Sequence, residues 1–374
     1  MIIHLKKGVA EEQAKAMADE LSAFTIIKED GHVLISSSGI KELESRYDEL
    51  VEKTFLFDND MQLASRAYLS DTREVIIGDI KIGGSNKNTM VIGGPCSVES
   101  EEQITQSAEL MKELGISTLR AGCYKPRTSP YSFQGMGLEG LKLLDKMRSK
   151  YGLNIITEVR DSTHIDEIIE YADIIQIGAK SMYDHGILKR CGKTNKPVLL
   201  KRGFGTTLKE FVQMAEFILS GGNDNVILCE RGLRTFETAT RFTLDLCGVS
   251  YLKEYTNLPI ILDPSHAMGY ARSAAKSAAL GKASASDKTS VAVAPEDANN
   301  PLAQLGGRLK TRRNPVGDVR QPKAKESPRR RTGKLTIANA LNDDERQRSL
   351  ASVKRARERE KLARQQRSDG KRIV

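Results

Sequence analysis

Cationic side chains recur directly after short apolar runs across the middle of this sequence. Several are arginines, whose planar guanidinium can bind phosphate oxygens through two N–H groups at once. One charge in such a place is often a solvated residue at the rim of a fold. Several charges at one end of one sheet would instead form an electropositive funnel for a doubly charged phosphate. The residues are Arg120, Lys125, Arg127, Lys201, Arg202 and Arg231.

Two further residues suit a metal ion. Cys96 lies in the segment Gly-Pro-Cys-Ser-Val-Glu and His266 in Asp-Pro-Ser-His, and each segment follows an apolar run. A thiolate and an imidazole are ligands for a divalent transition metal, with Mn, Zn and Fe as candidates. A lone cysteine is more often a small core residue. Two ligands are too few for a site, so at least one carboxylate must come from elsewhere in the chain.

The elements that must position these residues alternate regularly. Between residues 89 and 269, apolar runs recur about 28 residues apart, with helical patterns between them, as repeated strand–helix units require. Ser100-x-x-Gln103 and Thr207-x-x-Glu210 are capping boxes that begin two of these helices. The expected strands cover residues 90–93, 118–121, 154–158, 174–177, 198–201, 226–229 and 260–263.

Seven such units with chemistry after the strands predict an α/β fold of the TIM (β/α)8 type. Active sites in that fold lie at the carboxyl ends of the strands. An open doubly wound sheet is the alternative, and the absence of Gly-x-Gly-x-x-Gly after the first strand disfavours it. The barrel domain is expected at residues 89–271, without a recognisable eighth strand–helix unit. Residues 291–294, with Glu296 as a ligand, are a weak candidate for the eighth strand.

The sequence before the barrel predicts a separate small domain. Residues 1–62 follow a β-α-β-β-α-β pattern, with an Asp30-Gly31 turn, a second helix at 40–51 and a last strand at 54–57. This order predicts a ferredoxin-like α+β domain, either regulatory or for dimerisation. Residues 63–88 are expected to be a linker that leads into the barrel.

After residue 271 the composition changes completely. Residues 272–374 contain 26 Lys and Arg against 11 Asp and Glu, and no aromatic residue or cysteine. Such a segment buries too little apolar surface to fold, so we expect a disordered basic tail with one helix at residues 349–366. The rest of the chain is acidic.

Composition also indicates the cellular compartment in which the protein works. The five cysteines are scattered and form no C-x-x-C pair, which indicates a reducing environment without a disulfide framework. No stretch is long and apolar enough to span a membrane, and the first residues lack the apolar segment of a signal peptide. We therefore expect a cytoplasmic protein.

One segment carries a specific resemblance. Residues 120–135 read RAGCYKPRTSPYSFQG and resemble the signature of the type I beta 3-deoxy-7-phosphoheptulonate (DAHP) synthases. Further segments match in order, and the resemblance covers about residues 1–271. It implies an aldol-like condensation of phosphoenolpyruvate with erythrose 4-phosphate, the first step of the shikimate pathway, by a homo-oligomer. The 3-deoxy-octulosonate 8-phosphate synthases share the barrel but carry an Asn-rich stretch where this chain has Lys125–Pro130, so they rank second.

The resemblance also implies roles for single residues. The metal would polarise the aldehyde as a Lewis acid, and Lys125 and His266 would be the catalytic residues. Lys180 stands where the family usually has Arg. The Glu and Asp that complete the family's metal site are not recognisable, so we expect weak metal binding, and the activity of this chain stays open. The implied ligands of phosphoenolpyruvate are Arg120, Lys125, Lys201 and Arg231, those of erythrose 4-phosphate are Arg127, Thr128 and Ser129, and those of the metal are Cys96 and His266.

The tail has a resemblance of its own. Residues 329–341 and 346–360 are similar to the basic segment upstream of the GTPase domain in bacterial translation initiation factor two. A chimeric chain is implied. Without aromatic residues to stack on bases, any binding of nucleic acid by the tail would be weak and electrostatic. A second class of function is therefore an RNA- or ribosome-associated arm on an inactive barrel.

Overall fold

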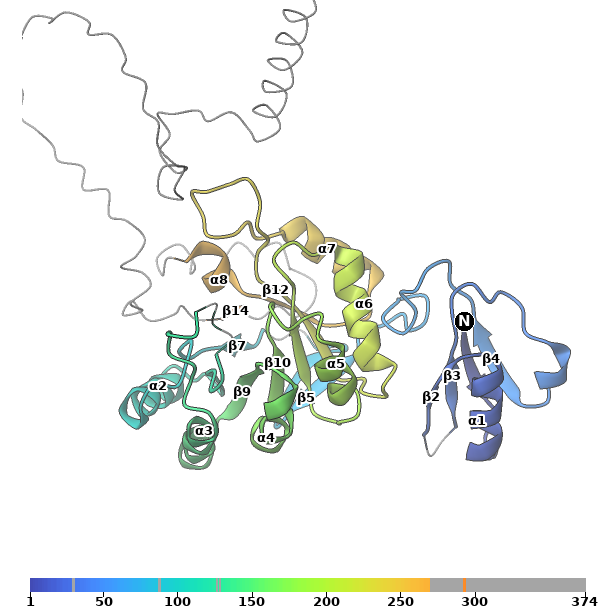
Figure 1. Ribbon diagram of the computed structural model, residues 1–374, viewed down its shortest axis with the longest axis horizontal. Helices are drawn as coiled ribbons and strands as arrows, with labels where there is room; N and C mark the ends of the chain where they lie inside the picture. Colours follow the sequence, from blue (N-terminus) through green and yellow to red (C-terminus); the bar gives the residue numbers. More distant parts are fainter. Residues whose placement is uncertain (29–30, 87–88, 126, 128, 270–291, 294–374) are drawn as a thin grey trace, which may run out of the picture. The chain divides into compact units, whose positions relative to one another are not determined.

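The computed structural model describes residues 1–28, 31–86, 89–125, 127, 129–269 and 292–293 (Figure 1). The first domain pairs its strands antiparallel in the order β2-β3-β1-β4. Helix α1 packs on this sheet through Ala14 and Met17, which share an apolar cluster with Ile3 and Leu34. The elements are β1 (Ile2–Leu5), α1 (Glu11–Glu20), β2 (Phe24–Ile26), β3 (Val33–Ile35) and β4 (Val51–Phe55).

The second helix expected in this domain is wrong. Residues 40–51 contain one 3-10 turn, Ser45–Tyr47, and β4 already begins at Val51. Tyr47 and Leu50 nevertheless reach the same apolar cluster as α1. The apolar spacing thus reflects the burial of an irregular segment. Val51, which was expected to end the helix, instead pairs with Leu5 as the first residue of β4.

The second domain is a parallel sheet of eight strands in the order β7-β14-β13-β12-β11-β10-β9-β8. Gly93, which follows β7, exchanges backbone hydrogen bonds with Thr118 and Arg120 of β8, so the first and last strands also join and the barrel closes. An α/β barrel is therefore confirmed. Its strands are β7 (Val91–Ile92), β8 (Thr118–Arg120), β9 (Asn154–Val159), β10 (Ile174–Ile177), β11 (Val198–Lys201), β12 (Val226–Glu230), β13 (Ile260–Leu262) and β14 (Ala292–Val293).

The eighth position in the sheet is filled, which corrects the expected absence of an eighth strand. Ala292 pairs with Leu262 of β13 and with Val91 of β7, and Val293 pairs with Ile92. The weak candidate at residues 291–294 therefore marks the right place. The remainder of the expected tail, including Glu296 and the helix at 349–366, lies outside the described residues.

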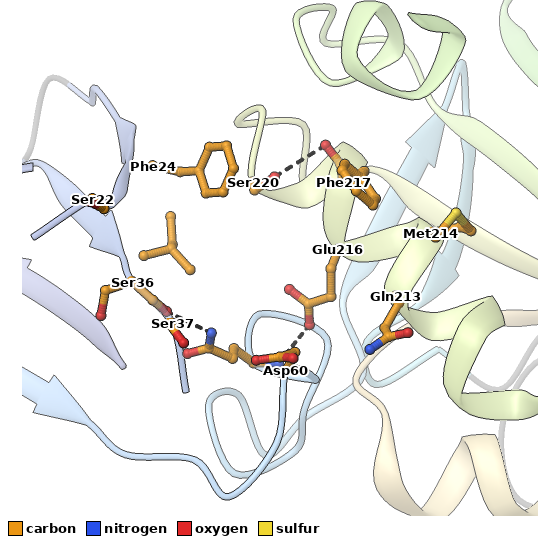
Figure 2. Close-up of a pocket in the computed structure, with 12 residues that line it drawn as sticks. Ser22, Phe24, Ser36, Ser37, Asp60, Gln213, Met214, Glu216, Phe217 and Ser220 are labelled. Atoms are coloured by element: carbon orange, nitrogen blue, oxygen red, sulfur yellow. Dashed lines mark hydrogen bonds between the residues drawn. The ribbon is translucent and has the colours of Figure 1, made fainter. Parts of the chain in front are cut away.

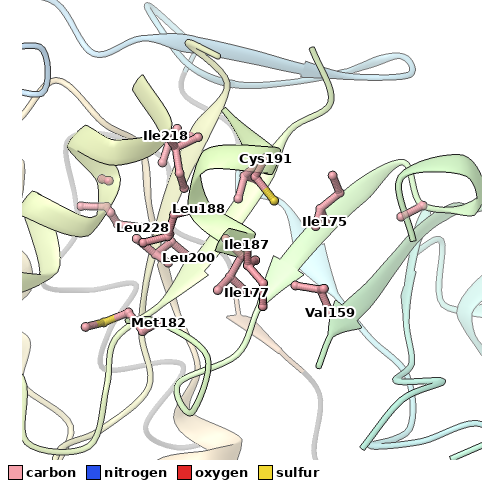
Figure 3. Close-up of a cluster of buried hydrophobic side chains, with 14 of the residues drawn as sticks. Val159, Ile175, Ile177, Met182, Ile187, Leu188, Cys191, Leu200, Ile218 and Leu228 are labelled. Carbon is pink, nitrogen blue, oxygen red and sulfur yellow. The ribbon is translucent and has the colours of Figure 1, made fainter. Parts of the chain in front are cut away.

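Helices follow most strands and cover the barrel. Thr207 forms a complete capping box with Glu210 at the start of α6, as predicted. Ser100 caps α2 by accepting a hydrogen bond from the Gln103 backbone, but the Gln103 side chain accepts the Glu99 N–H, so only half of the predicted box forms there. Figure 3 shows how strand residues such as Ile175 pack against Ile187 of α5. The helices are α2 (Glu101–Glu113), α3 (Leu138–Tyr151), α4 (Ile165–Tyr171), α5 (His185–Cys191), α6 (Leu208–Leu219), α7 (Leu246–Tyr255) and the short α8 (Pro264–Met268).

A hairpin that the sequence did not predict fills the amino-terminal half of the barrel. Strands β5 (Glu74–Ile77) and β6 (Ile80–Gly83) pair antiparallel within the expected linker. Val75, Ile77 and Ile82 are buried in one apolar cluster with residues from the first half of the barrel strands, such as Ile174 and Leu199. Apart from the segments left undescribed, the structure has no helix with the length and apolarity needed to cross a bilayer.

Candidate active site at the carboxyl ends of the strands

Five cationic side chains lie buried at or just beyond the carboxyl ends of the barrel strands. Their residues are only 3–6% exposed. A buried charge is costly unless it is paired or hydrogen-bonded, so the partners of each cation decide what it can do. Arg120 and Lys201 are the last residues of β8 and β11. Within a few residues, Lys125 follows β8, Arg202 follows β11 and Arg231 follows β12.

Lys201 is held by a carboxylate that it shares with a histidine. Its Nζ lies 2.8 Å from Oδ2 of the fully buried Asp263, and His266 Nδ1 lies 2.6 Å from the same oxygen. Asp263 Oδ1 accepts the His266 backbone N–H and so caps α8. Burial alone would raise the pKa of the Asp263 carboxyl, but His266 and Lys201 together hold that pKa well below its usual range. Asp263 is therefore an ionised anchor for both neighbours.

Arg202 is neutralised within the protein. Its guanidinium lies 2.9 Å from both Glu230 and Asp245 and also donates to the Thr206 carbonyl. Glu230 additionally accepts the backbone N–H of Gly232 at 2.7 Å. These bonds occupy Nη1 and Nε, and two carboxylates balance the charge of Arg202, so Arg202 fixes the loops after β11 and β12.

Arg120 contacts an amide and a carboxylate, and Lys125 contacts Cys96. Arg120 Nε donates to Gln176 Oε1 at 3.2 Å, and its Nη2 lies 3.9 Å from Glu158 Oε2. Lys125 Nζ donates to the carbonyl of Cys96 at 2.7 Å and contacts its sulfur at 2.8 Å. The structure thus brings Lys125 and Cys96 together.

Arg231 is the most available of the five. Its guanidinium carbon lies 4.8 Å from the Phe204 ring centroid and 4.4 Å from that of Phe242. Its buried Nη1 has no hydrogen-bond partner among the described residues. A desolvated cation with an open N–H group is poised for an anion. Burial lowers the pKa of this guanidinium, and Asp263 partly restores it, so Arg231 stays charged.

The predicted residues of the second substrate lie further out. Arg127 and Ser129 are partly exposed and bond within their own loop, Arg127 Nε to the Phe133 carbonyl and Ser129 Oγ to the Tyr131 N–H. Lys180 is exposed in the turn after β10. Thr128 lies outside the described residues. Arg127, Ser129 and Lys180 are thus less buried than the five cations at the strand ends.

The predicted metal ligands give only a partial donor set. Cys96 follows β7 and His266 lies on α8 after β13, and these strands are two positions apart in the sheet, as expected. The contact of His266 Nδ1 with the Asp263 carboxylate is of the kind that orients metal-binding imidazoles. In the described part of the chain, no group of three His, Cys, Asp or Glu side chains is arranged to hold a metal. The described residues alone do not make a metal site.

A cavity of about 500 Å³ lies away from this site, between residues of the first domain and helix α6 (Figure 2). Phe24 and Ser36 line it from the first domain, and Phe217 and Glu216 from α6. Glu216 accepts the backbone N–H groups of residues 62, 63 and 64 at 2.7–3.2 Å. Burial raises the pKa of its carboxyl to about 7, against these hydrogen bonds. Glu216 therefore ties the lead-in segment to the barrel.

Comparison with known proteins places this geometry in a family. Residues 61–287 match the model of the DAHP synthetase I family. A phospho-2-dehydro-3-deoxyheptonate aldolase from Thermotoga maritima is 41% identical over 277 residues, covering 72% of this chain and 81% of the relative. A 2-dehydro-3-deoxyphosphooctonate aldolase from Methylobacillus flagellatus is 31% identical over 195 residues, covering 50% and 68%.

Solved structures of similar proteins indicate the same family. The crystal structure of the phospho-2-dehydro-3-deoxyheptonate aldolase (DAHP synthase) from Thermotoga maritima superposes with a TM-score of 0.60 at 36% identity, covering 78% of this chain and 87% of that one. A truncated form of a Thermotoga maritima 3-deoxy-D-arabino-heptulosonate 7-phosphate synthase gives a TM-score of 0.57 at 41% identity, with coverage of 62% and 83%.

Proposed function

The chain belongs to the DAHP synthetase I family, and on that premise we propose that it condenses phosphoenolpyruvate with erythrose 4-phosphate. The products are 3-deoxy-7-phosphoheptulonate and inorganic phosphate. One observation on this chain's own residues supports the proposal. The buried Arg231 has no hydrogen-bond partner for its Nη1 among the described residues, and it lies at the carboxyl end of the barrel beside the Lys201–Asp263–His266 group.

The charges of the site suit the first substrate. Phosphoenolpyruvate carries a phosphate and a carboxylate on three carbons, so it needs several cations close together. We assign this role to Arg120, Lys125, Lys201 and Arg231. Among the described residues of the mouth, four carboxylates oppose five buried cations, which leaves a positive surplus of one for an anion; the carboxylates are Glu158, Glu230, Asp263 and Asp245.

The reaction balances with water. C3 of phosphoenolpyruvate forms a bond to the aldehyde carbon of erythrose 4-phosphate, and the aldehyde oxygen takes a proton. Water adds at C2 of phosphoenolpyruvate, and the C2–O bond to phosphate then breaks. Preorganised cations in a dry site stabilise the charge that develops, and Lys125 and His266 are the assigned catalytic residues. Arg127, Thr128 and Ser129 are assigned to the phosphate of the aldose, and Lys180 is assigned to substrate binding.

Metal dependence is general in this family. We propose Cys96 Sγ and His266 Nε2 as two of the ligands, which supply the thiolate and imidazole that divalent transition metals favour. The identity of the metal and its weak binding stay predictions. The cytoplasmic location, a homo-oligomeric state and nucleic-acid binding by residues 272–374 also stay predictions.

The test is an assay of the full chain with both substrates and added Mn²⁺. We expect phosphate release that requires erythrose 4-phosphate and consumes phosphoenolpyruvate one to one. Lys125→Ala should lower kcat/KM about 10²–10³-fold, because it removes a preorganised charge. Lys142→Ala is the matched control, since Lys142 is an exposed lysine on α3 paired with Glu139. Phosphate release without the aldose, or unchanged turnover in Lys125→Ala, would contradict the proposal.

The second candidate differs only in the aldose. An octulosonate 8-phosphate has eight carbons, so it requires a five-carbon aldose phosphate in place of erythrose 4-phosphate. The lower identity to the phosphooctonate aldolases, 31% against 41%, disfavours it. Running the assay with arabinose 5-phosphate distinguishes the two, and we expect the four-carbon aldose to give the higher kcat/KM.

A further inference from the structure

We infer that Phe204 and Phe242 are positioning residues, which hold the phosphate-binding guanidinium of Arg231 in place without neutralising it. The inference rests on the proposed function, because it takes Arg231 as a ligand of phosphoenolpyruvate. It adds two aromatic side chains from different loops to the machinery of the site.

The two rings form one platform. Their centroids are 5.3 Å apart and their planes differ by 16°, so they are stacked. The Arg231 guanidinium carbon lies within 5 Å of both centroids. A guanidinium near an aromatic face is attracted by the ring quadrupole, and the attraction is strongest where water is excluded. Arg231 is 4% exposed, so this condition is met.

Arg202 shows how carboxylates, in place of aromatic rings, hold a buried arginine. It is equally buried, but Glu230 and Asp245 both lie 2.9 Å from its Nη1, and its Nε donates to the Thr206 carbonyl. Carboxylates orient an arginine by consuming its hydrogen-bond donors and cancelling its charge. Aromatic rings attract the cation without accepting its N–H groups in the manner of carboxylate oxygens, and Nη1 of Arg231 has no hydrogen-bond partner among the described residues. The rings thus allow a buried arginine to stay both ordered and available.

Backbone contacts fix the platform itself. The Phe242 N–H donates to the Ala267 carbonyl at 2.8 Å, one residue after His266, and the Arg234 N–H donates to the Phe204 carbonyl at 2.8 Å. Gly232 has a positive φ of 94°, and a Cβ there would lie 2.7 Å from Phe242 Cβ. Glycine at this position lets the loop after β12 fold tightly over α8. The Phe204 backbone is therefore held by the loop that carries Arg231, and the Phe242 backbone by α8, which carries His266.

The experiment is a double-mutant cycle read by calorimetric binding of phosphoenolpyruvate to the full chain. Phe242→Leu and Phe204→Leu should each weaken binding about tenfold, because each removes one desolvated cation–π contact. Phe242→Tyr keeps the ring and should bind within about twofold of wild type. In an Arg231→Ala background, Phe242→Leu should change the dissociation constant by less than about twofold, because the group that the ring positions is gone.

Controls separate positioning from general packing. Arg234→Ala removes an exposed arginine that lies 5.8 Å from the Phe204 ring, and it should leave binding unchanged. In the assay, the leucine variants should raise KM for phosphoenolpyruvate and leave KM for erythrose 4-phosphate unchanged. Equal binding by wild type and the leucine variants, or the same loss in the Arg231→Ala background, would overturn the inference alone. Absence of phosphoenolpyruvate binding by wild type would instead overturn the proposed function, and the inference with it.

Discussion

The two ends of the barrel strands bury different kinds of side chain. Toward their amino ends, Ile156, Ile174 and Ile227 pack against the β5–β6 hairpin in a purely apolar cluster. At their carboxyl ends, the strands finish in Arg120, Lys201 and other charged residues that are just as buried. Apolar packing is the cheaper way to fill a barrel, since buried charges need partners to offset their desolvation. Buried charges at the carboxyl ends therefore cost folding stability, and we attribute them to the proposed binding of phosphoenolpyruvate.

The largest predicted effect comes from breaking the pairing at the charged end. Asp263→Ala leaves the buried Lys201 without its carboxylate and removes the anchor of His266. We expect the free energy of unfolding to fall by about 3–5 kcal/mol, the usual cost of an uncompensated buried charge. Urea denaturation of both proteins measures this difference.

A matched surface pair gives the control. Asp166→Ala removes an exposed carboxylate 2.7 Å from Arg190 and should cost less than about 1 kcal/mol. Similar losses in the two variants would mean that the pairs at the mouth are no more important to the fold than surface pairs.

A somewhat smaller effect should follow from opening the apolar end. Ile82→Ala removes a fully buried side chain of the hairpin and should cost about 2–4 kcal/mol through lost burial and a residual cavity. Ile76→Ala, on the partner strand but 53% exposed, is the control and should cost well under 1 kcal/mol. Phosphoenolpyruvate affinity should be unchanged in both, and a loss of affinity in a folded Ile82→Ala protein would show that the two ends are not independent.

The smallest effect is a pH dependence from Glu216. Glu216 is half-buried where Asp263 is fully buried, backbone N–H groups hold it where Asp263 has two cations, and its carboxyl has a pKa of about 7. The folded chain therefore keeps a proton there that the unfolded chain loses near pH 4.5. Stability from this group is full below pH 4.5 and is lost as pH rises to 7, by about 2 kcal/mol between pH 5 and pH 7.

Comparison with Glu216→Gln isolates that dependence. The variant cannot ionise at this position, so the stability of wild type relative to the variant should fall as pH rises from 5 to 7. Denaturation midpoints measured across this range test the difference. Parallel stability curves for the two proteins would show that Glu216 does not titrate in the fold.

The sequence was most informative where strands are continuous apolar runs. Strands β10 and β11 have the predicted bounds, because four consecutive apolar or barrel-lining residues leave little choice. The eighth strand gave almost no signal, since Ala292 and Val293 are small and their place is set by pairing with β13 and β7. The β5–β6 hairpin was missed because its two short alternating runs are stabilised by the barrel interior, which lies far away in the sequence.

The same distinction applies to the site. The cations were predicted because their position after a strand places them at the mouth. Their partners were not, because pairing depends on neighbouring strands, as where Gln176 lies opposite Glu158 in the β9–β10 register. Phe204 and Phe242 belong to loops, and loop sequences lack the periodic pattern from which the position of a side chain could be predicted. Their contact with Arg231 appears only in three dimensions.

The most direct test of the charged end is a crystal structure of the chain with phosphoenolpyruvate. We predict phosphate oxygens within hydrogen-bond distance of Arg231 Nη1 and the ligand in contact with Lys125 and Lys201. Phosphoenolpyruvate bound elsewhere, such as the cavity beside α6, with the barrel mouth empty, would contradict the assignment of these buried cations to substrate binding.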